Sequence, residues 1–240
     1  NLKEITLTTN GTLLKKYSKD LKKNGIDRIN VSLDTINSKK YNTITRFGNL
    51  NKVIDGIKEA KDNNISIKIN TVAIKNFNED ELEELIQWAN EQLIDITFIE
   101  VMPMEETDTS RHLQFAPLDD IYNNLNNKFH FNKIDKNTGG PAVYYASKFL
   151  SINVGFITPL TNNFCSSCNR VRISSTGKLF MCLGQNDYVD FREILRSDHS
   201  DDFIKEKIQL GLKTKAFKHD FLVEEDSIPY MKRHMNVTGG

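Results

Sequence analysis

Short runs of alternating apolar and polar residues recur through the first half of the chain. They predict four strands, at residues 5–9, 28–34, 65–72 and 96–101. Between the strands, apolar residues recur at helical spacing and predict helices, at residues 13–24, 50–60 and 82–93. Asn78, with Glu81 three residues later, fits a capping box ahead of the last helix. Strands that alternate with helices indicate an α/β layer built on a parallel sheet.

Polar residues and one methionine lie at the carboxyl ends of the predicted strands. These are Thr8, Thr9, Asn10, Ser32, Asp34, Asn70, Thr71, Glu100 and Met102. Functional groups of parallel α/β sheets gather at this edge. Each of these residues is also an ordinary turn or core residue when it is taken singly. As a group they predict a ligand-binding rim.

The second half lacks the regular alternation of the first. The polar stretch 104–116 has no periodicity and predicts a surface loop or lid. A helix is expected after Pro117, followed by strands near 142–145 and 152–157. We therefore expect two domains, 1–116 as a β/α layer and 117–240 as a mixed α+β domain.

Composition narrows the class of protein. The 240 residues carry 32 Lys and Arg against 32 Asp and Glu, and this balance argues against bulk binding of nucleic acid. No apolar run is long enough to span a membrane, and the first residues do not resemble a secretory leader. Three cysteines are an odd number, which disfavours a disulfide framework and favours a reduced, cytoplasmic protein.

All three cysteines lie within one 18-residue window, Cys165, Cys168 and Cys182, with the spacing Cys-x2-Cys-x13-Cys. Three converging thiolates suit either zinc or an iron–sulfur cluster. None of the five histidines lies in the window, although a distant histidine could complete a zinc site. The spacing alone leaves both metals open, so a zinc-binding nucleotide- or RNA-binding module without catalysis is the alternative.

Two arginines, Arg170 and Arg172, follow the Cys-x2-Cys directly. At this spacing in an extended segment their side chains project from one face. Guanidinium groups bind phosphate or carboxylate bidentately, although they could also neutralise thiolate charge. Because three thiolates leave one coordination position vacant, we favour a site that seats a charged substrate.

Several motifs occur along the whole chain in one order. They are Thr-Thr-Asn-Gly at 8–11, Asn-Val-Ser-Leu-Asp at 30–34, Lys-Ile-Asn-Thr-Val at 68–72, Phe-Ile-Glu-Val-Met at 98–102, Phe-Cys-x2-Cys-Asn-Arg-Val-Arg at 164–172 and a terminal Gly239-Gly240. In this order they resemble the GTP 3′,8-cyclase family of molybdenum cofactor biosynthesis, a branch of the radical S-adenosylmethionine (SAM) enzymes.

The resemblance implies an incomplete TIM-type barrel and a C-terminal α+β iron–sulfur domain. It implies that Cys165, Cys168 and Cys182 bind a [4Fe–4S] cluster with an open iron that holds GTP. Thr8, Lys68, Arg170 and Arg172 would contact GTP, Ser32 and Met102 would line the SAM site, and Gly239 and Gly240 would reach into the active site. It further implies a homodimer and a functional partnership with cyclic pyranopterin monophosphate synthase.

In the family, a second, N-terminal [4Fe–4S] cluster cleaves SAM to a 5′-deoxyadenosyl radical, which abstracts hydrogen from the ribose C3′ of GTP. Its Cys-x3-Cys-x2-Cys motif does not occur in these 240 residues. We therefore expect a chain that lacks the first barrel units, binds one cluster and does not start the radical reaction alone.

Overall fold

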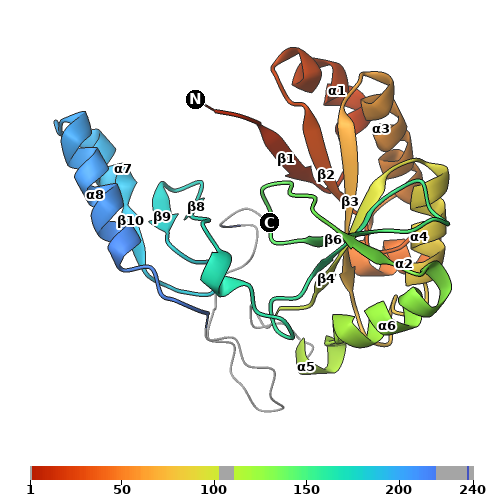
Figure 1. Cartoon of the computed structure of the whole chain (residues 1–240). Coiled ribbons are helices and arrows are strands. Elements are labelled where there is room, and N and C mark those ends of the chain that lie inside the picture. The colour runs from red at the N-terminus through yellow and green to blue at the C-terminus, as the bar shows by residue number, and fades with distance from the viewer. Residues whose placement is uncertain (1, 103–110, 220–236, 238–240) are drawn as a thin grey trace. The chain divides into compact units, whose positions relative to one another are not determined.

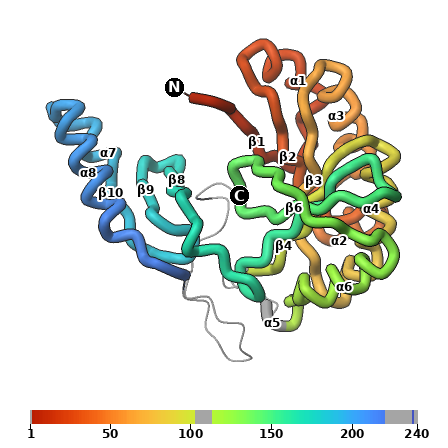
Figure 2. The backbone as a smooth tube through the Cα atoms, in the orientation of Figure 1, coloured from red at the N-terminus to blue at the C-terminus, as the bar shows by residue number. Residues whose placement is uncertain are grey.

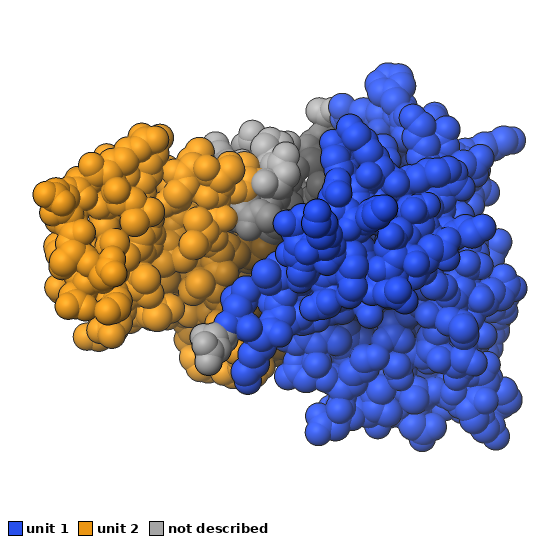
Figure 3. Space-filling view, turned by 90° about the horizontal axis from the view of Figure 1, so that it is seen from above, with its two compact units in different colours: residues 1–101, 114–161 blue, residues 102–113, 162–240 orange. Residues whose placement is uncertain are grey.

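The computed structural model describes residues 2–102, 111–219 and 237. Its contacts divide the chain into two compact units, coloured separately in Figure 3. Unit 1 comprises residues 1–101 and 114–161, and unit 2 comprises residues 102–113 and 162–240. Residues 117–161, which we expected to belong with the C-terminal domain, pack with the β/α layer.

Unit 1 is built on a seven-stranded sheet with the strand order β1-β2-β3-β4-β7-β6-β5 (Figure 1). The strands are β1 (Thr6–Thr9), β2 (Arg28–Ser32), β3 (Ser66–Ala73), β4 (Asp95–Glu100), β5 (Asn132–Ile134), β6 (Val143–Ala146) and β7 (Val154–Ile157). The first four are parallel, as predicted, and β7 adds a fifth parallel strand beside β4. β6 runs antiparallel to both of its neighbours, β7 and β5.

Helices connect the parallel strands, and their order along the backbone can be followed in Figure 2. They are α1 (Leu14–Lys23), α2 (Ser38–Thr45), α3 (Leu50–Asp62), α4 (Leu82–Glu91), α5 (Arg111–Gln114) and α6 (Leu118–Phe129). Asn37 and Asn49 cap α2 and α3 by accepting hydrogen bonds from first-turn backbone amides. Gly56 of α3 lets that helix approach α1, since a Cβ there would lie 2.9 Å from the Cβ of Leu14, the first residue of α1.

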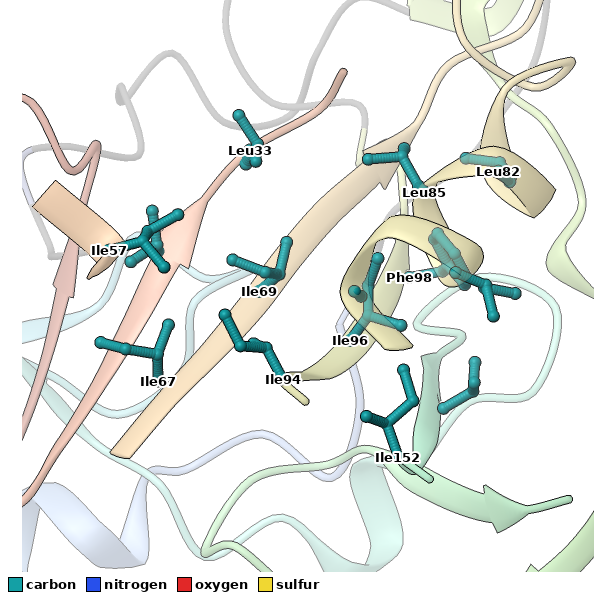
Figure 4. Close-up of a cluster of buried hydrophobic side chains, with 14 of the residues drawn as sticks. Leu33, Ile57, Ile67, Ile69, Leu82, Leu85, Ile94, Ile96, Phe98 and Ile152 are labelled. Carbon is teal, nitrogen blue, oxygen red and sulfur yellow. The ribbon is translucent and has the colours of Figure 1, made fainter. Parts of the chain in front are cut away.

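The hydrophobic core lies between the sheet and its helices (Figure 4). Ile67, Ile69, Ile96 and Phe98 supply the sheet side, and Leu85 is among the helix residues that meet them. The intervening strand residues are mostly polar and face the opposite way, because side chains alternate along a strand. We call this second surface the polar face of the sheet.

Unit 2 contains a three-stranded antiparallel sheet with the order β10-β9-β8. Its elements are β8 (Arg172–Ile173), β9 (Lys178–Phe180), β10 (Tyr188–Asp190), the 3-10 turn η1 (Cys165–Ser167), α7 (Phe191–Arg196) and α8 (Asp201–Lys213). Leu179, Met181 and Phe191 form its small core. Gly177 makes the turn between β8 and β9 with a φ of +80°, a conformation that favours glycine.

Two local predictions are wrong. Asn78 does not cap α4, because its side chain accepts from the Ile74 amide at 2.7 Å and donates to the carbonyls of Asp34 and Val72. The predicted loop 104–116 includes one helical turn, α5, and Phe115 forms a β-bridge with Ile74; residues 103–110 lie outside the described part. None of the helices in the described ranges combines the length and apolar character needed to cross a membrane.

Candidate functional site

The polar face of unit 1 brings several predicted site residues into cross-strand register. Thr8 in β1 lies opposite Asn30 in β2, which lies opposite Lys68 in β3. One step further along the strands, Ser32 lies opposite Asn70. The parallel register therefore places Thr8 and Lys68 two strands apart in one row, with Ser32 in the next row.

Lys68 is a buried lysine, only 8% exposed. Its ammonium donates a hydrogen bond to the Tyr144 hydroxyl at 3.3 Å. Across the described ranges, no ion pair joins Lys68 to a carboxylate. Since a buried charge without a counter-charge is unfavourable, this ammonium is suited to an anionic ligand.

Ser32 and Asn70 mark the carboxyl ends of their strands. Ser32 is exposed, and the Oδ1 atom of Asn70 is buried with no hydrogen-bond partner among the residues that the structure describes. An unpaired buried acceptor is uncommon and is suited to a donor from a ligand. Met102 lies two residues beyond β4 and is half-buried.

Two other residues of the predicted rim hold the fold together. The Glu100 carboxylate, 1% exposed, accepts hydrogen bonds from the Leu118 amide at 3.3 Å and the Leu160 amide at 2.9 Å. It also accepts from the amide and hydroxyl of Thr161. Asp34 accepts from the Val72 amide, and burial raises the pKa of its carboxyl to about 6.

The cysteine segment lies in unit 2. Cys165 lies in η1 and Cys168 follows it, with the Cys168 amide donating to the Cys165 carbonyl at 3.1 Å. Cys182 comes two residues after β9. All three are free and partly buried. The Cys-x2-Cys segment therefore folds as a tight turn.

Two cationic side chains, Arg170 and Lys215, lie near Cys168. The Arg170 guanidinium stacks over the Phe164 ring at 5.4 Å, and Lys215 donates to the Arg170 carbonyl at 2.6 Å. Lys215 also lies 3.9 Å from the Cys168 sulfur. Burial alone would raise the pKa of the Cys168 thiol, but hydrogen bonds and charge from Arg170, with the charge of Lys215, lower that pKa overall.

The donor set suits a soft metal centre, because three thiols of one unit supply ligands typical of zinc or an iron–sulfur cluster. Within the described ranges, however, no group of three or more His, Cys, Asp or Glu side chains is already arranged to hold a metal ion. Arg172 begins β8, opposite Phe180. Gly239 and Gly240 lie outside the described residues.

Three residues near these sites were missed by the sequence analysis. Tyr144 and Thr138 lie at Lys68, and Lys215 lies at the cysteine turn. None belongs to a recognisable motif. Tyr144 and Lys215 reach their positions through long-range contacts, and Thr138 is joined to the Tyr144 hydroxyl. Alternation in β6 is the only sequence signal that could have placed Tyr144 on the polar face.

Two family models match successive parts of the chain. The family model described as "Radical SAM superfamily" matches residues 1–89, and the model "Molybdenum Cofactor Synthesis C" matches residues 94–221. A solved structure titled "Native anSMEcpe with bound AdoMet and Cp18Cys peptide" has a TM-score of 0.52 at 16% identity, and the match covers 96% of this chain and 72% of that one. At this identity the likeness shows the fold alone.

Curated relatives are much more similar to this chain in sequence than that solved structure is. Proteins named GTP 3′,8-cyclase from Brucella ovis and Brucella canis are each 46% identical over 240 residues, which is 100% of this chain and 70% of theirs. The chain therefore has the α/β fold of the radical SAM superfamily. Within that superfamily, it belongs to the GTP 3′,8-cyclase family of molybdenum cofactor biosynthesis.

Proposed function

We propose that this chain acts in the conversion of GTP to (8S)-3′,8-cyclo-7,8-dihydroguanosine 5′-triphosphate, the first step of molybdenum cofactor biosynthesis. One observation carries the proposal: 46% identity to GTP 3′,8-cyclases extends along the whole chain, through both the radical SAM and the C-terminal family regions. In the family, SAM and an N-terminal iron–sulfur cluster supply the organic radical that opens the reaction. Because the Cys-x3-Cys-x2-Cys motif of that cluster is not among these 240 residues, we do not propose that this chain starts the radical reaction alone.

The mostly parallel sheet of unit 1 supports an incomplete TIM-type barrel with the polar face as its interior. Such barrels carry ligands at the carboxyl ends of their strands. Ser32, at the end of β2, and Met102, beyond β4, are our candidates for SAM contacts. The Asn70 side-chain oxygen, which has no partner among the described residues, lies in register with Ser32 and supports a polar ligand at this position.

For GTP we propose contacts from Thr8 and Lys68 in unit 1 and from Arg170 and Arg172 in unit 2. The buried ammonium of Lys68 would meet an anionic group of the nucleotide, which would supply the counter-charge that no described carboxylate provides. The arginines would bind phosphate or a base carbonyl through their paired N–H donors. The terminal Gly239 and Gly240 are proposed to approach the same substrate.

For the metal centre we propose that Cys165, Cys168 and Cys182 hold a [4Fe–4S] cluster in a C-terminal domain that follows the barrel domain. By their contacts, residues 117–161 belong with the barrel unit, so the cluster-binding part comes after them in the chain. Arg170 and Lys215 favour the thiolate form of Cys168 that a metal requires. The three free thiols also support a reducing, cytoplasmic setting. We further propose a homodimer whose product passes to cyclic pyranopterin monophosphate synthase.

The test is anaerobic reconstitution of the chain with iron and sulfide, followed by metal analysis, visible spectroscopy and GTP binding. We expect iron and sulfide in matching amounts, a broad brown absorption and saturable binding of GTP. Replacement of Cys165, Cys168 and Cys182 by serine provides the control and should abolish the absorption. Colourless, stoichiometric zinc without GTP binding would overturn the proposal in favour of a structural zinc module.

A further inference from the structure

A buried tyrosine lies against the Lys68 ammonium on the polar face of unit 1. Tyr144 is 1% exposed and is among the largest fully buried side chains of the described residues. Its hydroxyl oxygen accepts the hydrogen bond from Lys68 at 3.3 Å and lies 3.0 Å from the Thr138 hydroxyl. The Tyr144 oxygen is therefore held from two sides.

The sheet register brings this ring to β3 from a distant strand. Tyr144 in β6 lies opposite Gly155 in β7, which lies opposite Thr97 in β4. A Cβ at Gly155 would come within 2.9 Å of the Tyr144 ring and 2.8 Å of the Thr97 hydroxyl. Only a residue without a side chain leaves this space, so Gly155 allows the ring to cross the sheet toward Lys68.

Tyr145, the next residue in β6, points to the opposite side of the sheet from Tyr144. Tyr145 faces the helices and packs against Tyr122 and Phe156, with ring centroids 4.9 and 5.7 Å away. Tyr144 points away from that aromatic cluster, to the polar side. Strand alternation and the neighbouring Gly155 therefore place the Tyr144 hydroxyl beside the buried Lys68 ammonium on the polar face.

The electrostatics explain why a tyrosine suits this position. Burial alone would raise the pKa of Tyr144, but the hydrogen bond with Thr138 and the charge of Lys68 outweigh it and lower that pKa. A neutral hydroxyl orients the ammonium and leaves its positive charge uncancelled. A carboxylate at the same place would neutralise Lys68 and compete with an incoming anion.

We propose that Tyr144 is a positioning residue that fixes the Lys68 ammonium on the polar face, so that its charge is directed to the phosphate oxygens of the bound nucleotide. The proposal rests on the role of Lys68 in GTP binding. It adds that the strength of this contact depends on a hydroxyl supplied by β6 and anchored by Thr138.

The test compares GTP with guanosine, which lacks phosphate, in equilibrium binding to the reconstituted chain. For Tyr144→Phe we expect about a tenfold weaker affinity for GTP, as for loss of one hydrogen bond to a charged group, and unchanged affinity for guanosine. Lys68→Gln should weaken GTP binding at least as much. The double variant should be no weaker than Lys68→Gln alone, because Tyr144 acts through Lys68. Tyr145→Phe is the matched control and should bind both ligands normally.

Each of the other outcomes would overturn the proposed role of Lys68, the inference about Tyr144, or both. Normal GTP binding by Lys68→Gln would remove the proposed role of Lys68 and this inference with it. Weak binding by Lys68→Gln with normal binding by Tyr144→Phe would overturn the inference alone. Equal losses for GTP and guanosine, or additive losses in the double variant, would show a merely structural role. If Tyr144→Phe does not fold, Thr138→Val decides: a loss of about threefold for GTP only supports the inference, and no loss overturns it.

Discussion

The Asp34 carboxylate, just beyond the end of β2, accepts a hydrogen bond from the backbone amide of Val72 in β3 at 2.8 Å. The Asp34 carbonyl in turn accepts from the Asn78 side chain at 2.7 Å. Asp34 therefore joins two parallel strands where the regular ladder ends and links them to the segment before α4. This junction positions the carboxyl edge on which Ser32 and Asn70 lie.

The pH dependence of stability should report on Asp34. Burial raises the pKa of its carboxyl from 3.8 to about 6, so the folded state binds a proton more tightly than the unfolded chain does. Its contribution to the unfolding free energy is therefore present at low pH and is lost as pH rises through this range. We expect that contribution to grow by about 1 kcal/mol between pH 7.5 and pH 5.

The measurement is urea unfolding of the wild-type chain and of Asp34→Asn across this pH range. Asparagine keeps an oxygen that can accept from Val72 but does not titrate. As pH falls, the unfolding free energy of the wild-type chain should increase relative to that of Asp34→Asn. A difference that is constant with pH would contradict the raised pKa.

Replacement of Glu100 should destabilise unit 1. Its buried carboxylate accepts the amides of Leu118, Leu160 and Thr161, and Glu100→Ala would leave these donors without partners. We expect a loss of about 3 kcal/mol in the free energy of unfolding, measured by denaturant titration. The control is Glu84→Ala on the exposed side of α4, which should change stability by less than about 0.5 kcal/mol. Equal effects would show that the Glu100 contacts are not stabilising.

Gly155→Ala should disturb the polar face without touching Lys68 directly. The added methyl group would meet the Tyr144 ring at 2.9 Å and the Thr97 hydroxyl at 2.8 Å, so one of them must move. Overpacking of this kind costs about 1–3 kcal/mol of stability, which thermal unfolding can measure. Gly140→Ala is a matched control, because nothing lies within 4 Å of its Cβ position. Equal stability of the two variants would mean that Tyr144 has more room than the structure shows.

Cys182→Ser should remove the metal centre, because two thiolates retain a cluster poorly. After reconstitution, we expect iron and sulfide to fall to the level of a protein without a cluster. Ser166→Ala, an exposed change within η1, should keep the full content. Retention of iron by Cys182→Ser would remove Cys182 from the proposed ligand set.

Arg172→Ala should separate nucleotide binding from metal binding. We expect GTP affinity to fall about tenfold through loss of a charge-assisted contact, while iron content stays normal. Arg196→Ala, an exposed arginine at the end of α7 in the same unit, should leave both unchanged. Loss of iron in Arg172→Ala would instead indicate that this arginine supports the cysteine turn.

Much of the β/α layer was predictable, because its signals are local. Alternation in β1 to β4 and helical spacing in α1, α3 and α4 are set by neighbouring residues, and all appear in the structure. The role of Asn78 was not predictable. Its capping pattern is local, but the side chain is used by the ends of β2 and β3, which the chain brings together from far away in sequence.

By itself, the sequence determined the alternation of strands and helices, the family and the cysteine and arginine motif, since each depends on residue type at a fixed spacing. Only the tertiary structure decided that residues 117–161, with β7 among them, join the first unit. It also decided that the Glu100 carboxylate accepts backbone hydrogen bonds and that Tyr144 reaches Lys68. These depend on register between strands distant in sequence. Which long-range pairing wins is settled by packing and burial over the whole unit, and no single segment carries that information.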